Sequence, residues 1–166
     1  MLADASNDVA VARAQRFEEA LDSARFHQWE PTSAPSVLTD LDRLSSPLLD
    51  KAGGLRSLPW MENPRFAERS NECALVHLER CVDFDGVSAG LLLMTSESFY
   101  PEHTHPPSEM YLVVAGQAEW RFGGATEYVP VAPMTILMNE PNDVHGLRTS
   151  DEPVLALWVL FEDETN

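Results

Sequence analysis

The sequence is poor in basic residues. Eleven lysines and arginines stand against 27 aspartates and glutamates, so the formal net charge at pH 7 is −16. Nucleic acids and anionic membrane surfaces are negatively charged and would repel such a chain, so we expect neither as a partner. The single lysine, Lys51, precedes Ala-Gly-Gly in a polar connection, which does not suit a buried Schiff-base lysine.

Cysteine and long apolar runs are also scarce. Cys73 and Cys81 permit at most one disulfide, and two free thiols in a reducing cytosol are the default expectation. No apolar run approaches the length of a membrane span. The N-terminal segment, residues 1–8, lacks the basic region and apolar core of a signal peptide. We therefore expect a cytoplasmic protein.

The pattern of apolar residues changes near residue 70. Helical spacing of Ala10, Ala14, Phe17 and Leu21 predicts a helix over residues 8–26, and a shorter helical piece is expected over 36–44. From residue 73, short apolar runs alternate with turn residues, as is typical of a β-sandwich or small barrel. The predicted strands are 74–79, 88–96, 99–105, 109–115, 118–122, 126–129, 135–138, 144–148 and 154–161. We divide the chain into an N-terminal helical extension, 1–70, that packs on a β-barrel domain, 71–166.

Three of the five histidines gather with a glutamate in one pattern. His103 and His105 are two residues apart, so on an extended strand both imidazoles project from one face. The prolines at 106–107 end that strand, and Glu109 opens the next one, where it can meet both histidines. His145, from a third strand, would complete a mixed nitrogen and oxygen site. Zn, Fe, Mn and Ni accept such ligands.

These residues carry a resemblance to a known superfamily. His103-x-His105-x3-Glu109-x6-Gly116 resembles the first cupin motif, and residues 141–145, Pro-Asn-Asp-Val-His, resemble the second. The chain departs from the pattern twice: Asn142 and Glu97 stand where the family usually has glycine. Asparagine tolerates a left-handed backbone better than most residues, so we expect the turn at Asn142 to survive. The resemblance implies a mainly β fold, the cupin double-stranded β-helix, which is a jelly-roll-like barrel.

A closer resemblance covers more of the chain. Tyr100-Pro-x-His-x-His-Pro-x-x-Glu-x-Tyr111, followed by Gly116-x-Ala-x-Trp120, is similar to the cupin-type dimethylsulfoniopropionate lyases, which also have a helical segment ahead of the barrel. This implies a lyase that converts a small zwitterionic carboxylate to acrylate and dimethyl sulfide by α-proton abstraction and β-elimination. It implies one divalent transition metal per chain. One alternative is a cupin dioxygenase or another metal-dependent cupin enzyme that acts on a small carboxylate. The other is a non-catalytic cupin that binds a small ligand or a metal.

Strand parity sorts the residues that follow Glu109. If Glu109 points into the barrel mouth, so does Tyr111, whereas Leu112 and Val114 face the other way. That second face is apolar as well, so another sheet, the N-terminal helices or a second subunit must cover it. We expect a homodimer through the barrel strands and the N-terminal helices.

The tyrosines are the candidate catalytic residues. Because the histidines and Glu109 are committed as ligands, Tyr111 and Tyr100 remain as nearby proton acceptors. Tyr111 shares the face of Glu109, and we assign it proton abstraction. Tyr100 would face the opposite way on a regular strand unless Pro101 breaks it, and we assign it substrate positioning or auxiliary base work.

Aromatic side chains can also hold a dimethylsulfonium group by cation–π contact. Tyr100, Trp120, Trp60 and Trp158 are available, and we assign substrate binding to Tyr100 and Trp120. His77 lacks a partner motif, so we expect a hydrogen-bonded scaffold residue there.

Overall fold

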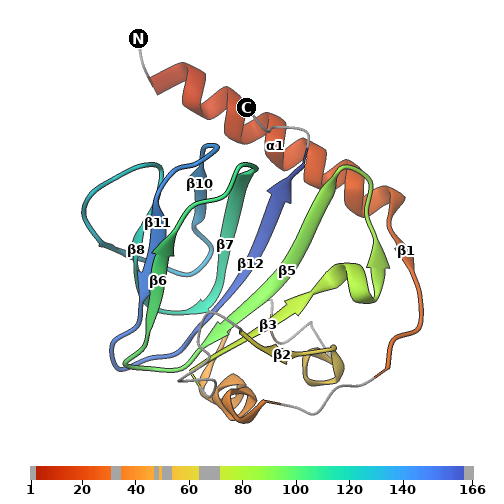
Figure 1. Ribbon diagram of the computed structural model, residues 1–166, viewed down its shortest axis with the longest axis vertical. Helices are drawn as coiled ribbons and strands as arrows, with labels where there is room; N and C mark the ends of the chain where they lie inside the picture. Colours follow the sequence, from red (N-terminus) through yellow and green to blue (C-terminus); the bar gives the residue numbers. More distant parts are fainter. Residues whose placement is uncertain (1–2, 31–34, 47–48, 50–53, 64–71, 163–166) are drawn as a thin grey trace.

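The computed structural model describes residues 3–30, 35–46, 49, 54–63 and 72–162. Two antiparallel β-sheets face each other (Figure 1). The larger sheet has the order β10 (Ile136–Asn139), β7 (Ser108–Gly116), β12 (Val154–Phe161), β5 (Val87–Met94), β3 (Cys73–His77) and β2 (Met61–Glu62). The smaller sheet has the order β6 (Phe99–His103), β11 (His145–Arg148), β8 (Ala118–Arg121) and β9 (Val129–Val131). The predicted boundary at residues 70 and 71 and Lys51 lie outside the described residues.

The central strand β12 shows how the sequence builds two cores. It pairs along its whole length with β5 on one side and β7 on the other. Its even-numbered residues, such as Ala156 and Trp158, pack between the two sheets. Its odd-numbered residues, such as Leu155 and Val159, pack on the outer face of the larger sheet. A strand covered on both faces reads as a continuous apolar run, which is what residues 154–161 are.

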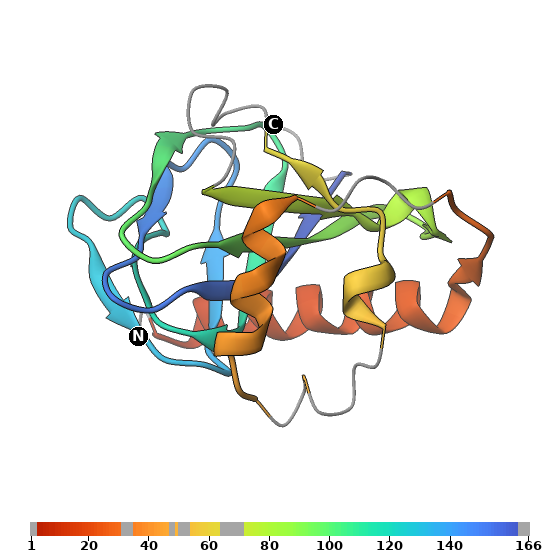
Figure 2. The same cartoon turned by 90° about the horizontal axis from the view of Figure 1, so that it is seen from below.

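The N-terminal part of the chain covers that outer face (Figure 2). Helix α1 (Ala3–Ser23) places Phe17 and Ala20 against the end of β12, and the 3-10 helix η1 (Ser36–Arg43) packs Val37 and Leu38 beside Leu155. The apolar outer side of β7, including Val114, is therefore covered within one chain. Within the described ranges, no helix combines the length and the apolar character that crossing a membrane requires.

The predicted fold class is confirmed: the chain is mainly β, with a jelly-roll-like barrel and an N-terminal helix. Several boundaries were wrong. Helix α1 ends at Ser23, and β1 (Arg25–Phe26) pairs instead with β4 (Val82–Asp83). The strand expected at 74–79 turns into a short 3-10 helix, η4 (Leu78–Arg80), and the strand expected at 126–129 lies at Val129–Val131. Cys73 and Cys81 are buried free thiols, as expected.

Candidate metal centre and active-site cavity

Three histidines meet where the two sheets close on each other. His103 ends β6 and His145 begins β11, and the two lie opposite each other in the strand register. His105 follows two residues after β6. The ligating nitrogens of these three residues all lie within 4.8 Å of one another. The structure thus brings together the three histidines that the sequence singled out.

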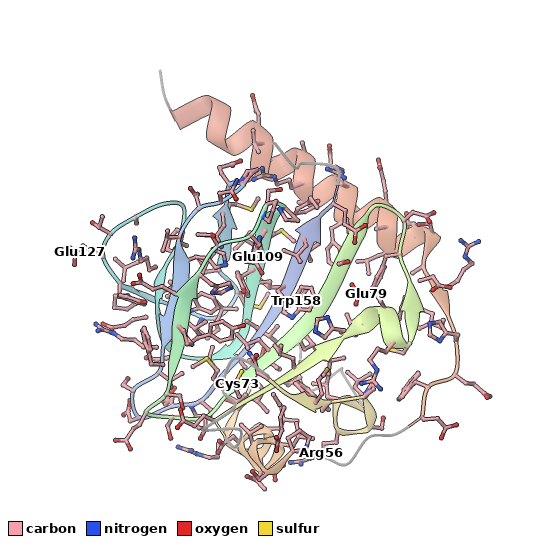
Figure 3. All side chains as sticks on the ribbon, viewed as in Figure 1. Arg56, Cys73, Glu79, Glu109, Glu127 and Trp158 are labelled. Carbon is pink, nitrogen blue, oxygen red and sulfur yellow. The ribbon has the colours of Figure 1, made fainter. Side chains whose placement is uncertain are left out.

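Glu109 approaches this group from the opposite sheet. It lies on β7, and Oε2 is 3.1 Å from Nε2 of His105 and 3.0 Å from Nε2 of His145. Figure 3 shows Glu109 between the two sheets, at the end of the barrel that α1 crosses. Burial raises the pKa of the Glu109 carboxyl, but the hydrogen bonds and positive charges of His105 and His145, when these rings carry a proton on Nε2, outweigh burial and lower that pKa to about 2. Glu109 is therefore an anion at neutral pH.

The hydrogen bonds of the histidines suit a metal cation. In each ring Nδ1 faces a backbone carbonyl: Pro101 at 3.0 Å from His103, Pro107 at 2.8 Å from His105 and Asp143 at 2.8 Å from His145. A carbonyl oxygen can only accept, so Nδ1 carries the hydrogen and the lone pair of the neutral ring is on Nε2. Backbone partners of this kind orient the histidines of metal sites.

His145 shows this most clearly. Its Nε2 is buried and has no hydrogen-bond partner among the described residues, although it lies 3.0 Å from the Glu109 carboxylate. A nitrogen lone pair and a carboxylate oxygen that face each other repel unless a proton or a cation lies between them. The donor set therefore fits a divalent metal held by His103, His105, His145 and Glu109.

A bulge in β6 turns Tyr100 towards this group. His145 pairs with His103 and Leu147 pairs with Tyr100, so two residues of β6 oppose the single residue Gly146 on β11. Such a bulge adds one residue and reverses the parity of the strand. Tyr100 and His103 therefore share a face although they are three residues apart, and their ring centroids lie 5.1 Å apart. Regular parity would have placed Tyr100 on the outside.

A cavity of about 250 Å³ extends from the histidines between the sheets. Its lining residues are Met61, Asn63, Leu75, His77, Leu92, Tyr100, His103, His105, Glu109, Tyr111, Trp158 and Leu160. One end is polar, and the remainder is mostly apolar. No lysine or arginine occurs among these lining residues, so a bound carboxylate finds no cationic side chain on the described walls.

Tyr111 lies on the cavity wall next to Glu109. Its side chain is buried, and burial raises the pKa of the phenol well above its usual value; the nearby Glu109 carboxylate and a hydrogen bond to it raise that pKa further. Tyr111 and Tyr100 thus reach the same cavity from opposite sheets. The inward direction predicted for Tyr111 by parity is confirmed.

Trp120, which was expected to bind the substrate, lies behind the cavity wall. It is 2% exposed, it packs behind Tyr111 with ring centroids 5.0 Å apart, and it is not among the described residues that line the cavity. Trp158 is the tryptophan that lines the cavity, whereas Trp60 packs in the outer core. Trp120 lies opposite Leu147 in the strand register and belongs to the same buried cluster as Tyr111.

Sequence reasoning missed Met61, Asn63 and His77 in the cavity wall, besides three leucines. Met61 and Asn63 come from β2 and the residue after it, and His77 ends β3. His77 was expected to be a scaffold residue, but its ring lies edge-on to Trp158, with centroids 5.2 Å apart. No motif surrounds these three residues, and only the pairing of β2, β3 and β5 brings them to the site.

The sequence of the chain matches a known protein family and one of its characterised members. The family model for dimethylsulfoniopropionate lyases matches residues 13–156, which is most of the chain. The dimethylsulfoniopropionate lyase DddQ of Ruegeria pomeroyi is 32% identical over 75 residues, which cover 44% of this chain and 36% of DddQ. The matched segment thus spans about a third of that curated relative.

Solved structures show the same fold. The crystal structure of DddQ from Ruegeria pomeroyi has a TM-score of 0.74 at 21% identity and covers 95% of this chain and 91% of its own. A chain from the crystal structures of the lyases RdDddP and RnDddQII has a TM-score of 0.73 at 21% identity, with 85% and 79% covered. Similarity at this identity establishes the fold, and the family model establishes the lineage. The chain belongs to the dimethylsulfoniopropionate lyase family.

Proposed function

We propose that the protein is a metal-dependent lyase that cleaves dimethylsulfoniopropionate to acrylate and dimethyl sulfide. The observation that carries the proposal is the polar end of the cavity, where the Nε2 atoms of three histidines, the Glu109 carboxylate and two tyrosines converge. Membership of the lyase family and the name of the relative DddQ support this substrate.

His103, His105, His145 and Glu109 would hold one divalent transition metal, with Zn, Fe, Mn and Ni as the candidates. When bound, the metal supplies a Lewis acid for the substrate carboxylate, which makes the α-proton more acidic, and a positive charge that lowers the pKa of a neighbouring phenol. Binding of the substrate carboxylate depends on this positive charge, because no lysine or arginine lines the described cavity walls.

In the elimination, Tyr111 is the residue of the chain that takes up the proton. The phenolate oxygen of Tyr111 takes the proton from the α-carbon. The electron pair of that C–H bond forms the double bond between the α- and β-carbons. The bond between the β-carbon and sulfur breaks, and its electron pair stays on sulfur. Neutral dimethyl sulfide leaves, acrylate keeps the negative charge, and the proton stays on Tyr111.

The remaining wall residues bind and orient the substrate. Tyr100, from the bulge in β6, lies beside His103 and faces the same cavity as Tyr111, which suits substrate positioning. Trp158 offers an aromatic face that can stabilise the sulfonium cation. Leu75, Leu92 and Leu160 give the cavity an apolar wall, which suits the uncharged dimethyl sulfide that forms.

The test measures headspace dimethyl sulfide from purified protein loaded in turn with Zn, Fe, Mn or Ni, in the presence and absence of oxygen. A lyase forms the gas equally well without oxygen, whereas a dioxygenase requires oxygen and forms other products. His145→Ala should lose most of its bound metal and its activity, because no other described side chain can replace the lost ligand. A metal-loaded protein that forms no dimethyl sulfide with any of the four metals would contradict the proposal.

A further inference from the structure

We propose that Arg13 of α1 is a positioning residue for the metal centre and that it acts through an ion pair with Glu140. The pair joins the N-terminal helix to the turn between β10 and β11. The inference rests on the metal site of the proposed function. It states that a helix far away in the sequence helps to fix the positions of the metal ligands. Figure 1 shows α1 crossing the end of the barrel where β10 leads into β11.

The ion pair has the geometry of a clamp. Nη1 and Nη2 of Arg13 donate to Oε1 and Oε2 of Glu140 at 2.9 and 2.8 Å. Arg13 is only 4% exposed, and its guanidinium lies 6.0 Å from the ring centre of Phe161. Two parallel hydrogen bonds fix the direction of the carboxylate as well as its distance. Glu140, which is mostly exposed, is thus held by a buried partner.

Glu140 opens a turn that is bonded to two of the histidines. The N–H of Asp143 donates to the carbonyl of Glu140 at 3.0 Å, and the N–H of Glu140 donates to Oδ2 of Asp143 at 3.0 Å. The N–H of Asn142 donates to the carbonyl of His105 at 2.9 Å. The carbonyl of Asp143 accepts from Nδ1 of His145 at 2.8 Å. A shift of this turn would therefore move His145 and the backbone of His105.

Asn139, the residue before Glu140, contacts another of the proposed ligands, Glu109. Asn139 is 1% exposed, and its Oδ1 accepts from the N–H of Gly123 at 2.9 Å. This bond turns Nδ2 of Asn139 towards Oε2 of Glu109, 3.5 Å away. The segment 139–143 thus contacts His105, His145 and Glu109, and Arg13 fixes it from outside the barrel.

The test compares Arg13→Met, Glu140→Gln and the double variant with wild type. The affinity for Zn²⁺ is measured by competition with a chromophoric chelator, and the Co²⁺ absorption spectrum reports the ligand geometry. Loss of a residue that orients metal ligands weakens metal binding by about 10–100-fold, and we expect about tenfold because Arg13 acts at one remove. The double variant should be no weaker than either single variant, because both remove the same interaction. Arg13→Lys, which keeps the charge but loses the fork, should be intermediate.

Arg16→Met is the matched control. Arg16 lies on the same helix over the same Phe161 ring, at 5.2 Å, and donates to the carbonyl of Gly86. The variant removes a guanidinium from the same helix and should keep the wild-type affinity for Zn²⁺. Wild-type affinity and an unchanged Co²⁺ spectrum in Arg13→Met and Glu140→Gln would overturn the inference. Should Arg13→Met not fold, the exposed Glu140→Gln decides alone. A wild-type protein that binds neither metal would instead refute the proposed metal centre.

Discussion

Three described residues other than glycine, Glu97, Met134 and Asn142, adopt a backbone conformation that normally favours glycine. Glu97 has φ 56° and Asn142 has φ 65°, and these are the two positions where the chain departs from the cupin glycines. The left-handed turn expected at Asn142 is confirmed. Asparagine adopts this conformation at little cost, whereas a glutamate side chain does not. Glu97 therefore holds a left-handed backbone against a local strain.

Glu97→Gly should stabilise the protein by about 0.5–1 kcal/mol, because relief of the left-handed conformation exceeds the added flexibility of the unfolded chain. Asn142→Gly should change the free energy of unfolding by less. Urea unfolding of both variants measures the difference. Glu97→Ala is the control, since alanine keeps the strain and should give no gain. A Glu97→Gly variant no more stable than wild type would show that the turn is not strained.

Tyr111→Phe tests the assignment of the base. The substitution removes one oxygen from the cavity wall, so the fold and most of the bound metal should remain. The rate of dimethyl sulfide formation should fall by about 10²-fold or more, the usual scale for a general base. Metal analysis and headspace assays of the same sample measure both quantities, with Tyr100→Phe as the matched variant. A wild-type rate with the metal still bound would rule Tyr111 out. Loss of metal together with activity would make it a ligand and move the base to Tyr100.

At the scale of elements, the sequence predicted what local patterns determine. Strand β12 was predicted with its observed bounds, Val154–Phe161, because a continuous apolar run marks a strand covered on both faces. Strands β1, β2 and β4 are two residues long and depend on distant partners, so alternation could not reveal them. The same holds for the site. The histidines and Glu109 stand in motifs, whereas His77 and Asn63 reach the cavity through strand pairing.

The contact between β5 and β12 gives a prediction at this scale. Gly90 lies opposite Trp158, and a Cβ at Gly90 would lie 2.1 Å from the Trp158 ring and 2.1 Å from the carbonyl oxygen of Val76. Gly90→Ala must therefore displace Trp158 and also move β3 away from β5. We expect a loss of stability of about 1–3 kcal/mol, the usual range for overpacking, and a lower activity. Thermal unfolding and the dimethyl sulfide assay measure the two effects.

Trp158→Phe supplies the matched background for that prediction. A smaller ring removes part of the obstacle, so Gly90→Ala should destabilise the Trp158→Phe variant less than it destabilises wild type. Equal losses in the two backgrounds would show that the carbonyl of Val76, and not the cavity tryptophan, limits the space at Gly90.

At the scale of the molecule, the homodimer stays a prediction. The apolar outer face of β7 that suggested a partner is covered by α1, η1 and neighbouring segments of the same chain. Two chains of net charge −16 would bring −32 together, so association should strengthen as salt screens the repulsion. Light scattering should give about 37 kDa, twice the chain mass of 18.5 kDa, at micromolar concentration and ~0.15 M salt. A mass of one chain at every salt concentration would contradict the dimer.

The stability of the whole molecule should fall in mild alkali, and of the two cysteines the buried thiol of Cys73 contributes more to this fall. Burial raises the pKa of Cys73 from 9.0 to about 12; a hydrogen bond from Asn63 lowers that pKa by less, and the Glu72 charge raises it further. The folded protein therefore keeps the thiol neutral at a pH where the unfolded chain has already released its proton. Stability from this group is complete below pH 9 and is lost as the pH rises towards 12. The loss between pH 8.5 and 10 should be about 1 kcal/mol.

Urea unfolding in a chelating buffer measures this loss, and Cys73→Ala should remove that pH dependence whatever its effect at pH 7. Cys81→Ala should remove a smaller part of the loss, because burial also raises the pKa of Cys81. An unchanged slope in Cys73→Ala would assign the alkaline loss to other groups.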